Sequence, residues 1–347
     1  GPTVTLAMVG DVLLHTPVEE SCQAEDGSYD FSGLFANVKE EVQAADIAIV
    51  NQEVIIGGEE LGVSGYPSFN APYEVADALA ETGFDVILHG TNHAMDQGKK
   101  GITNCLSNWE KKYPDIKILG INKSQDAQDI VTVLEQNGIK IAVLNYTYGL
   151  NGFTVPDEYS YIVNLMDKNH WDKVKSDIER AEKEADFTIV LPHWGQEYVQ
   201  PDPTKEQVKW AKMMTEAGAN LIIGTHPHVV EKIQWINADN GNKSLCYYSL
   251  GNYTSAQDMD ITMVGGMASF TLNYDPDTKK TSFTDTKFIP LITWFDVGYN
   301  AWKTYPIEDY NDSLAQTHNL ASNYDLSKEW VQQFVQSVMQ DCDGVEV

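Results

Sequence analysis

Five short segments of the chain place polar side chains that can bind metal directly after an apolar run. The segments are Met8-Val9-Gly10-Asp11, Ile49-Val50-Asn51-Gln52-Glu53, Leu88-His89-Gly90-Thr91-Asn92-His93, Ile189-Val190-Leu191-Pro192-His193 and Ile222-Ile223-Gly224-Thr225-His226-Pro227-His228. Their imidazole, carboxylate and amide groups suit Zn, Mn, Fe or Co better than Ca or Mg. Ligands bind beyond the carboxyl ends of the strands in open α/β sheets, so distant segments can meet in one crevice there.

Each segment taken alone also has a plainer interpretation. Asp11 can cap a helix. Glu53 can be an exposed loop acid, Asn92 with His93 can belong to a turn, and His193 can be a half-buried histidine with satisfied hydrogen bonds. His226-Pro227-His228 is different, because two imidazoles one residue apart are costly to bury unless something uses them. The joint pattern therefore favours a shared metal site.

The elements that must position these residues alternate short β-rich runs with amphipathic helical stretches up to about residue 250. We expect buried strands at Thr3–Val9, Asp46–Val50, Asp85–His89, Ile116–Leu119, Asp186–Leu191 and Leu221–Gly224. Helices are expected at Ala71–Thr82, Asp172–Ala185 and Thr204–Ala217, the last of which opens with a capping box. This order predicts a layered α/β sandwich with mixed sheets flanked by helices.

Antiparallel hairpins are expected in the C-terminal part of the sequence. The pairs are Val131–Leu134 with Lys140–Asn145, Val229–Ile236 with Ser244–Ser249, and Met267–Tyr274 with Ser282–Ile289. After Trp294 the sequence is loop-like until a terminal helix at Ser327–Gln340, whose apolar seam is Trp330, Phe334 and Val338. We predict one main domain over residues 3–295 and a C-terminal extension over 296–347.

The composition excludes several classes of function. With 51 acidic and 23 basic residues, the formal net charge is -28, so nucleic acid is not expected as a partner. Arg180 is the only arginine, so an anion must be held by lysine, backbone amides or metal. The four cysteines contain no C-x-x-C pair, which argues against a structural zinc site or thioredoxin-like redox chemistry.

In their order, the five segments resemble the motifs of the calcineurin-like metallophosphatases. Their wording resembles the CapA family of poly-γ-glutamate capsule synthesis proteins. The segments that carry this resemblance are Gly10-Asp11-Val12-Leu13, Asn51-Gln52-Glu53, Thr91-Asn92-His93-Ala94-Met95-Asp96-Gln97-Gly98, His193-Trp194-Gly195-Gln196-Glu197-Tyr198, Gly224-Thr225-His226-Pro227-His228-Val229 and Tyr248-Ser249-Leu250-Gly251-Asn252-Tyr253. The resemblance implies a metallophosphatase-like fold.

The resemblance also implies a role for each site residue. Asp11 and His228 would serve one metal ion. Asn92, His193 and His226 would serve the other, and Glu53 would bridge the two. His93 would protonate or steady the leaving oxygen, which is the catalytic role. Asp96 and Glu197 would contact the histidines on the side away from the metal ions and so orient their rings.

Two departures from the metallophosphatase pattern concern the metal site. The first motif has Leu13 where the superfamily has a histidine, and His15 follows two residues too late. The second motif has Glu53 where the superfamily has the shorter aspartate. We therefore expect the two ions to be bound unequally, with the Asn92, His193 and His226 side holding its ion more firmly.

The resemblance implies a poly-γ-glutamate capsule biosynthesis or export protein with a metal-dependent phosphoesterase-like hydrolase site. It would use one or two ions of Mn, Zn or Fe. The alternative is a non-catalytic subunit of a capsule synthesis complex that binds metal or polymer. Expected partners are an anionic cell-envelope polymer or phosphoester and membrane-bound capsule synthesis subunits. We expect a location on the outer face of a bacterial membrane or cell wall, with the Gly1-Pro2 start marking a removed signal or anchor.

Overall fold

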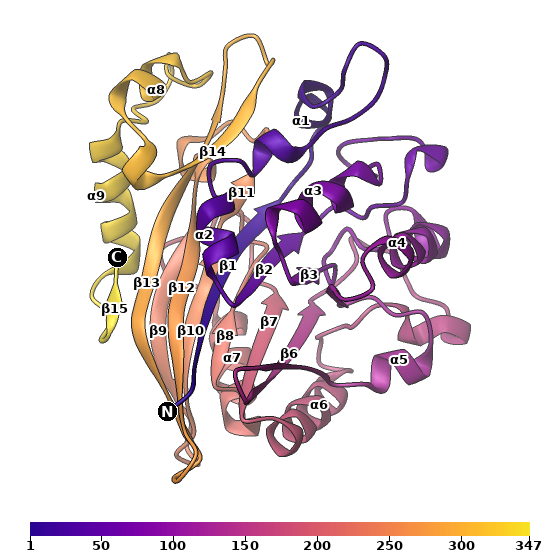
Figure 1. Cartoon of the computed structure of the whole chain (residues 1–347), viewed down its shortest axis with the longest axis vertical. Coiled ribbons are helices and arrows are strands. Elements are labelled where there is room, and N and C mark those ends of the chain that lie inside the picture. The colour runs from indigo at the N-terminus through magenta and orange to yellow at the C-terminus, as the bar shows by residue number, and fades with distance from the viewer.

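Two mixed β-sheets packed face to face form the centre of the computed structural model, which describes residues 1–347 (Figure 1). The strands of the first sheet are β1 (Thr3–Val12), β2 (Ile47–Gln52), β3 (Val86–Leu88), β4 (Lys117–Leu119), β11 (Asn252–Thr254), β12 (Val264–Asp275), β13 (Lys280–Phe295), β14 (Trp302–Pro306) and β15 (Val345–Glu346). Their order is β14-β13-β12-β1-β2-β3-β4, while β11 pairs with β1 and β15 with β13. Strands β1 to β4 run parallel, and β12 to β14 are antiparallel.

The second sheet contains the middle part of the chain. Its strands are β5 (Thr132–Gln136), β6 (Ile139–Thr147), β7 (Phe187–His193), β8 (Leu221–Ile223), β9 (Val230–Asn237) and β10 (Lys243–Leu250). The order is β5-β6-β7-β8-β10-β9, with β6, β7, β8 and β10 parallel and hairpins at both edges. The three hairpins expected from the sequence, β5–β6, β9–β10 and β12–β13, are confirmed.

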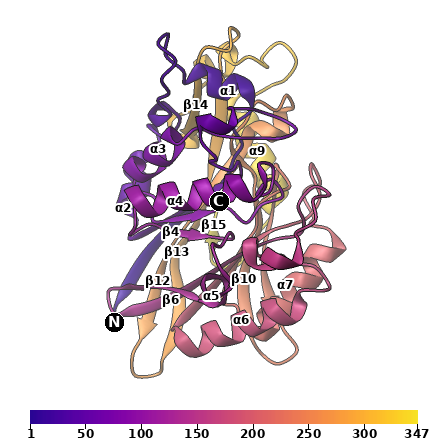
Figure 2. The ribbon, with the colours of Figure 1, turned by 90° about the vertical axis from the view of Figure 1, so that its right-hand side faces the viewer.

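Helices cover the outer faces of both sheets. They are α1 (Thr16–Ser21), α2 (Lys39–Ala44), α3 (Glu74–Thr82), α4 (Gly98–Lys112), α5 (Gln125–Asp129), α6 (Trp171–Glu184), α7 (Lys205–Ala217), α8 (Asp312–Thr317) and α9 (Lys328–Met339). Figure 2 shows α6 and α7 grouped apart from α2, α3 and α4, because the two groups cover different sheets. The layered α/β sandwich predicted from the sequence is confirmed.

Alternate residues of the parallel strands face different layers. In β1, Leu6 and Met8 join the apolar core between the two sheets, whereas Ala7 and Val9 join the core beneath α2, α3 and α4. This alternation follows from the period of two in a strand, and it explains why both faces are apolar. The ends of these strands are thereby fixed from both sides.

None of the helices combines the length and apolar character that crossing a bilayer requires.

The prediction that the chain is loop-like after Trp294 is wrong. β14 extends the first sheet and α8 follows it. Helix α9 lies beside β13 in Figure 1, and it buries Val331, Val335 and Val338 in the core between the sheets. Of the expected seam only Val338 is fully buried, since Trp330 and Phe334 stack on one another at the rim. The domain boundary at residue 295 stays a prediction.

Two further expectations need correction. The run at Ile116–Leu119 forms β4, but it is an edge strand that is only partly buried, because nothing pairs with its free side. Helix α4 was not expected from the sequence, although it spans 15 residues. It begins at Gly98 without a side-chain cap and contains a second glycine at Gly101, so the usual start signals are missing.

Candidate metal centre

The candidate ligands converge where parallel strands of the two sheets end. Asp11 lies near the end of β1, Glu53 follows β2, His193 ends β7, and His226 and His228 follow β8. Two groups of metal-competent side chains have ligand atoms within 4.8 Å of one another: Glu53 with His193 and His226, and Asp11 with Glu53 and His228. Glu53 belongs to both groups, so the structure places it between two possible ion positions.

The carboxylate of Glu53 is buried without conventional partners. Its Oε1 lies 2.9 Å from His193 Nε2 and its Oε2 lies 3.9 Å from His228 Nε2. Apart from the contact to His193, neither oxygen has a hydrogen-bond partner. His226 Nδ1 is also buried without a partner. Unsatisfied buried polar atoms are rare and costly, so these three atoms fit a site that holds a cation.

The Asn92 side of the cluster is organised around His193. Its Nδ1 lies 2.8 Å from Thr225 Oγ1, and its Nε2 lies 2.9 Å from Asn92 Oδ1. The contact to Thr225 fixes the ring so that Nε2 faces Glu53 and Asn92, which is the usual way in which a ligating histidine is oriented. The His226 ring lies 4.8 Å from the His193 ring. This side therefore offers two imidazoles, one amide oxygen and one carboxylate.

The Asp11 side contains one imidazole. His228 Nδ1 lies 3.1 Å from Asp11 Oδ2 and 2.9 Å from Asn252 Oδ1. The other oxygen of Asp11 accepts a hydrogen bond from Asn51 Nδ2 at 2.8 Å. Asn252 was not assigned a role from the sequence, and its amide oxygen is a further atom on this side that could bind a metal ion. His15 lies beside the cluster, but its Nδ1 accepts the Ala256 N–H at 3.0 Å.

Electrostatic coupling within the cluster is strong. Burial raises the pKa of Glu53, but the charge of His228 and the contact to His193 outweigh it and hold this pKa far below its ordinary value. Burial lowers the pKa of His228, but the charge of Glu53 and the contact to Asp11 raise it to about 10. Burial and the charge of His193 hold the pKa of His226 well below its usual range. His226 is therefore neutral, the form that binds a metal ion.

His93 lies at the edge of the cluster and is held by Asp96. Its Nδ1 lies 2.6 Å from Asp96 Oδ2, which also accepts the Phe69 N–H at 2.9 Å. Burial lowers the pKa of His93, but the hydrogen bond to Asp96 and the charge of Glu53 raise it above its ordinary value. This geometry keeps a protonated imidazole available beside the candidate ligands. Asn151 contacts both His93 and Asn92, at 3.4 Å and 2.9 Å.

The turn that carries two of the histidines has an unusual backbone. His226 and His228 have φ values of 105° and 61°, a region that residues other than glycine rarely adopt. Such conformations cost roughly 1–3 kcal/mol each and persist where the surrounding structure enforces them, which is common at functional sites. The Tyr198 N–H donates to Pro227 O at 2.8 Å and supports the turn.

Glu197 is placed differently from Asp96. Its side chain is exposed and makes no hydrogen bond to a site histidine, although its charge helps to raise the pKa of His228. Asn252, Asn151 and Thr225 were missed by the sequence reasoning. Asn252 and Asn151 lie a few residues beyond the ends of β10 and β6, where a single asparagine is also typical of a turn.

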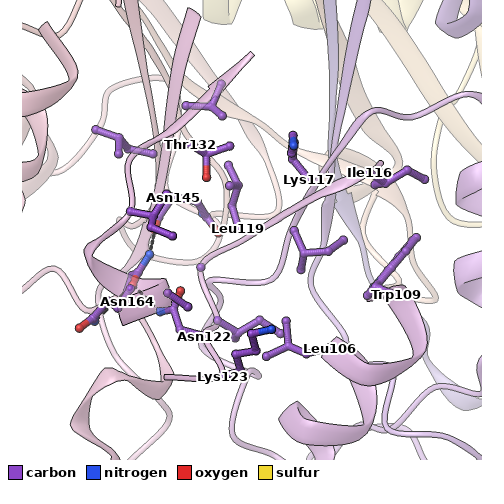
Figure 3. Close-up of a pocket in the computed structure, with 18 of the residues that line it drawn as sticks. Leu106, Trp109, Ile116, Lys117, Leu119, Asn122, Lys123, Thr132, Asn145 and Asn164 are labelled. Atoms are coloured by element: carbon purple, nitrogen blue, oxygen red, sulfur yellow. Dashed lines mark hydrogen bonds between the residues drawn. The ribbon is translucent and has the colours of Figure 1, made fainter. Parts of the chain in front are cut away.

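A separate cavity of about 300 Å³ lies between α4 and β4 on one side and β6 on the other (Figure 3). Leu106, Trp109, Leu119, Asn145 and Asn164 are among its lining residues, and none of the candidate metal ligands is. Two amides of the lining already have partners: the Asn145 side chain accepts the Gly90 N–H and donates to Leu191 O, and the Asn164 side chain donates to Asn145 O. The cavity therefore does not belong to the candidate metal centre.

The chain is thus a two-sheet α/β sandwich with two candidate ligand clusters that share one carboxylate at its strand ends. The chain belongs to the family described as "Bacterial capsule synthesis protein PGA_cap", whose family model matches residues 5–257. This family membership agrees with the resemblance seen in the motifs.

Two curated relatives are also named as PGA or capsule biosynthesis proteins. "PGA biosynthesis protein CapA" of Bacillus subtilis (strain 168) is 32% identical over 200 residues, which cover 57% of this chain and 50% of the relative. "Capsule biosynthesis protein CapA" of Bacillus anthracis is 25% identical over 277 residues, which cover 78% of this chain and 64% of the relative. The matched part thus spans half to about two thirds of the length of these relatives.

Solved structures align with the chain at low sequence identity. The calcineurin-like phosphoesterase YfkN from Bacillus subtilis is 13% identical with a TM-score of 0.47, covering 97% of this chain and 98% of that one. The NAD nucleotidase NadN of Haemophilus influenzae is 11% identical with a TM-score of 0.49, covering 99% of this chain and 57% of that one.

Proposed function

We propose that this capsule synthesis protein is a metal-dependent hydrolase of phosphoesters. The observation that carries the proposal is the fully buried Glu53 carboxylate, whose only close polar neighbours are the imidazoles of His193 and His228. A fully buried carboxylate in this state is costly unless a cation occupies the space beside it. The donor set of imidazole, carboxylate and amide oxygen favours Mn, Zn or Fe, with one or two ions.

The residues divide into three tasks. Asn92, His193, His226 and Glu53 would hold one ion, and Asp11, His228, Asn252 and Glu53 would hold the second. When bound, such ions act as Lewis acids toward a phosphoryl group and make a water-derived nucleophile available near neutral pH. His93, protonated and fixed by Asp96, would donate its proton to the leaving oxygen.

The biological setting in this proposal is capsule synthesis at the cell surface. Family membership and the CapA relatives support a role in capsule synthesis. The proposal adds that the polymer is poly-γ-glutamate and that the chain acts in its synthesis or export on the outer face of a bacterial membrane or in the cell wall. Membrane-bound synthesis subunits and an anionic envelope polymer or a phosphoester would be the partners. Ions bound at the centre would offset the repulsion between a polyanion and a chain of net charge -28.

A non-catalytic role is the second candidate. It is favoured by the absence of basic side chains from the site, where Asp11, Glu53 and Asp96 pair only with histidines. It is also favoured by Leu13, which cannot supply the imidazole implied at that place by the metallophosphatase resemblance. In this case the cluster would bind metal, polymer or a partner subunit without turnover.

Metal analysis combined with hydrolysis assays separates the two candidates. The chain is dialysed, loaded with Mn or Zn, and assayed with p-nitrophenyl phosphate and bis-p-nitrophenyl phosphate. His226→Ala, prepared in the same way, controls for contaminating phosphatases. Hydrolysis that depends on added metal and is lost in His226→Ala supports the enzyme. Retained metal with no hydrolysis of either substrate rejects the enzyme and leaves the binding role.

A further inference from the structure

Three exposed tyrosines surround the buried centre. Tyr66, Tyr148 and Tyr198 are 77%, 38% and 41% exposed, whereas the candidate ligands are at most 3% exposed. Each tyrosine lies near a different histidine of the site, Tyr148 and Tyr198 directly and Tyr66 through another ring. Tyr148 lies 4.6 Å from the His226 ring and Tyr198 lies 6.4 Å from the His228 ring. A molecule that reaches the centre from solvent therefore passes aromatic surfaces.

Tyr66 completes this arrangement through one intermediate ring. It contacts Phe69 edge to face at 6.3 Å, and Phe69 contacts His93 in the same way at 4.7 Å. We call Tyr66, Tyr148 and Tyr198 the tyrosine collar.

The backbone fixes two of the collar residues to the site itself. The Tyr148 N–H donates to His193 O at 2.9 Å, and the Tyr198 N–H donates to Pro227 O at 2.8 Å, between His226 and His228. Tyr198 also has a φ of 68°, a conformation held against its intrinsic cost. The collar is therefore part of the same rigid construction as the ligands.

The Tyr198 hydroxyl is tied to the centre by a chain of amides. His228 Nδ1 lies 2.9 Å from Asn252 Oδ1, Asn252 Nδ2 donates to Gln257 Oε1 at 2.7 Å, and Gln257 Nε2 donates to Tyr198 OH at 3.0 Å. This chain orients the phenol through the protein's own side chains. A surface that is ordered in advance binds with a smaller loss of conformational entropy.

The polar groups beside the collar are acidic. Glu197 is exposed and directly precedes Tyr198 in the chain. Asp258 is also exposed and directly follows Gln257, whose amide donates to the Tyr198 hydroxyl. Carboxylates of this kind accept hydrogen bonds from hydroxyl donors and repel anions, while the exposed tyrosine faces offer apolar contact.

We propose that the tyrosine collar binds a neutral sugar ring, which is the organic part of the substrate. A sugar presents apolar C–H faces to the aromatic rings and hydroxyl donors to Glu197 and Asp258. A polyglutamate segment would meet like charge at the collar and find no basic side chain among the ion pairs of the site, so only ions at the centre would hold it. The inference rests on the proposed function only for the statement that the sugar carries the phosphoryl group.

Binding of unphosphorylated probes tests the collar independently of hydrolysis. The full chain, with its metal, is titrated with cellotriose, with adenosine and with penta-glutamate, and saturation-transfer-difference NMR identifies the contacting protons. We expect cellotriose to bind at least about tenfold more tightly than adenosine, with signals from its ring C–H protons, and penta-glutamate to bind more weakly than cellotriose. Tighter binding of adenosine or penta-glutamate would overturn the proposal.

Variants locate the binding surface. Tyr148→Ala and Tyr198→Ala should each weaken cellotriose binding about tenfold, whereas Tyr148→Phe, which keeps the ring, should stay within about twofold. Tyr299→Ala is the matched control, since Tyr299 is 51% exposed and packs on Phe295 and Trp302 instead of a site histidine. Unchanged binding in both alanine variants would contradict the collar. Cellotriose binding without any phosphoester hydrolysis would instead reject only the proposed function.

Discussion

The imidazole of His228 and the side chain of Asn252 meet on the Asp11 side of the candidate metal centre, with His228 Nδ1 2.9 Å from Asn252 Oδ1. The sequence suggested that this side lacks a ligand, because Leu13 stands where the metallophosphatases have histidine. Asn252 supplies an oxygen there, but it does not replace an imidazole. Transition metals of this class bind imidazole more strongly than a neutral amide oxygen. The two sides should therefore still differ in affinity.

The first prediction is unequal metal occupancy. After dialysis the chain should retain about one transition-metal ion, held by Asn92, His193, His226 and Glu53, and a second should bind only on supplementation. His226→Ala should lose the retained ion. Asn252→Ala should weaken the second ion by about 10–100-fold and leave the first in place. Elemental analysis of the dialysed and reloaded proteins decides this, and two equally retained ions in the unmodified chain would contradict it.

The second prediction concerns Gly10, which lets β1 pass close to the turn before Asn252. A Cβ at Gly10 would collide with the carbonyl oxygen of Gly251, and the Asp11 N–H donates to this same oxygen at 3.0 Å. Gly10→Ala should lower the free energy of unfolding by about 1–3 kcal/mol. It should also lower the affinity for the second ion alone, because Asp11 and Asn252 both move.

Gly33→Ala is the control for this substitution, since a Cβ at Gly33 meets no atom within 4 Å. Urea unfolding and metal titration of the two variants give the comparison. Equal stability of Gly10→Ala and Gly33→Ala would show that the close approach at Gly10 is not required.

The third prediction separates His93 from the metal ligands. If the chain hydrolyses phosphoesters, His93→Gln should lower kcat by about 100- to 1000-fold, because the leaving oxygen loses its proton donor. Asp96→Asn should lower kcat about tenfold, since it weakens only the orientation of His93. Neither variant should change the metal content. Loss of metal in His93→Gln would instead make His93 a ligand.

The ligand positions could be predicted from the sequence because each lies directly after an apolar run. A strand that is buried on both faces is apolar throughout, so the first polar residue after it marks the sheet edge where ligands meet. Asp11, Glu53 and His193 follow this rule. Asn252 and Asn151 lie a few residues beyond β10 and β6, but a single asparagine after a strand is also common in turns, so the sequence alone could not distinguish them.

The tyrosine collar could not be predicted, because its geometry depends on tertiary contacts. Tyr66 belongs to a loop that is closed by an isolated bridge between Ser64 and Asn70, and it reaches the site only through Phe69. Tyr148 and Tyr198 are placed by backbone hydrogen bonds to segments far away in the sequence. Periodicity carries no signal for such contacts. The same limit applies to β14, a five-residue edge strand that is defined by its pairing with β13.

The last prediction uses a buried carboxyl group outside the metal centre. Glu231 in β9 is 0% exposed, its Oε1 accepts a hydrogen bond from Gln207 Nε2 at 2.7 Å, and its Oε2 has no partner. Burial raises the pKa of Glu231 from 4.5 to about 8. Below pH 4.5 the group is protonated in both the folded and the unfolded chain, so its proton equilibrium does not lower the free energy of unfolding there.

As the pH rises from about 4.5 to about 8, the unfolded chain releases this proton first, so the free energy of unfolding falls over that window. Glu231→Gln keeps the acceptor for Gln207 and removes the titration. Relative to the unmodified chain, it should gain on the order of 3 kcal/mol between pH 5 and pH 8.5. Urea unfolding at both pH values measures this gain, with Glu135→Gln on the exposed edge of β5 as the control that should show none. A pH dependence identical to that of the unmodified chain would mean that Glu231 is ionised in the folded protein.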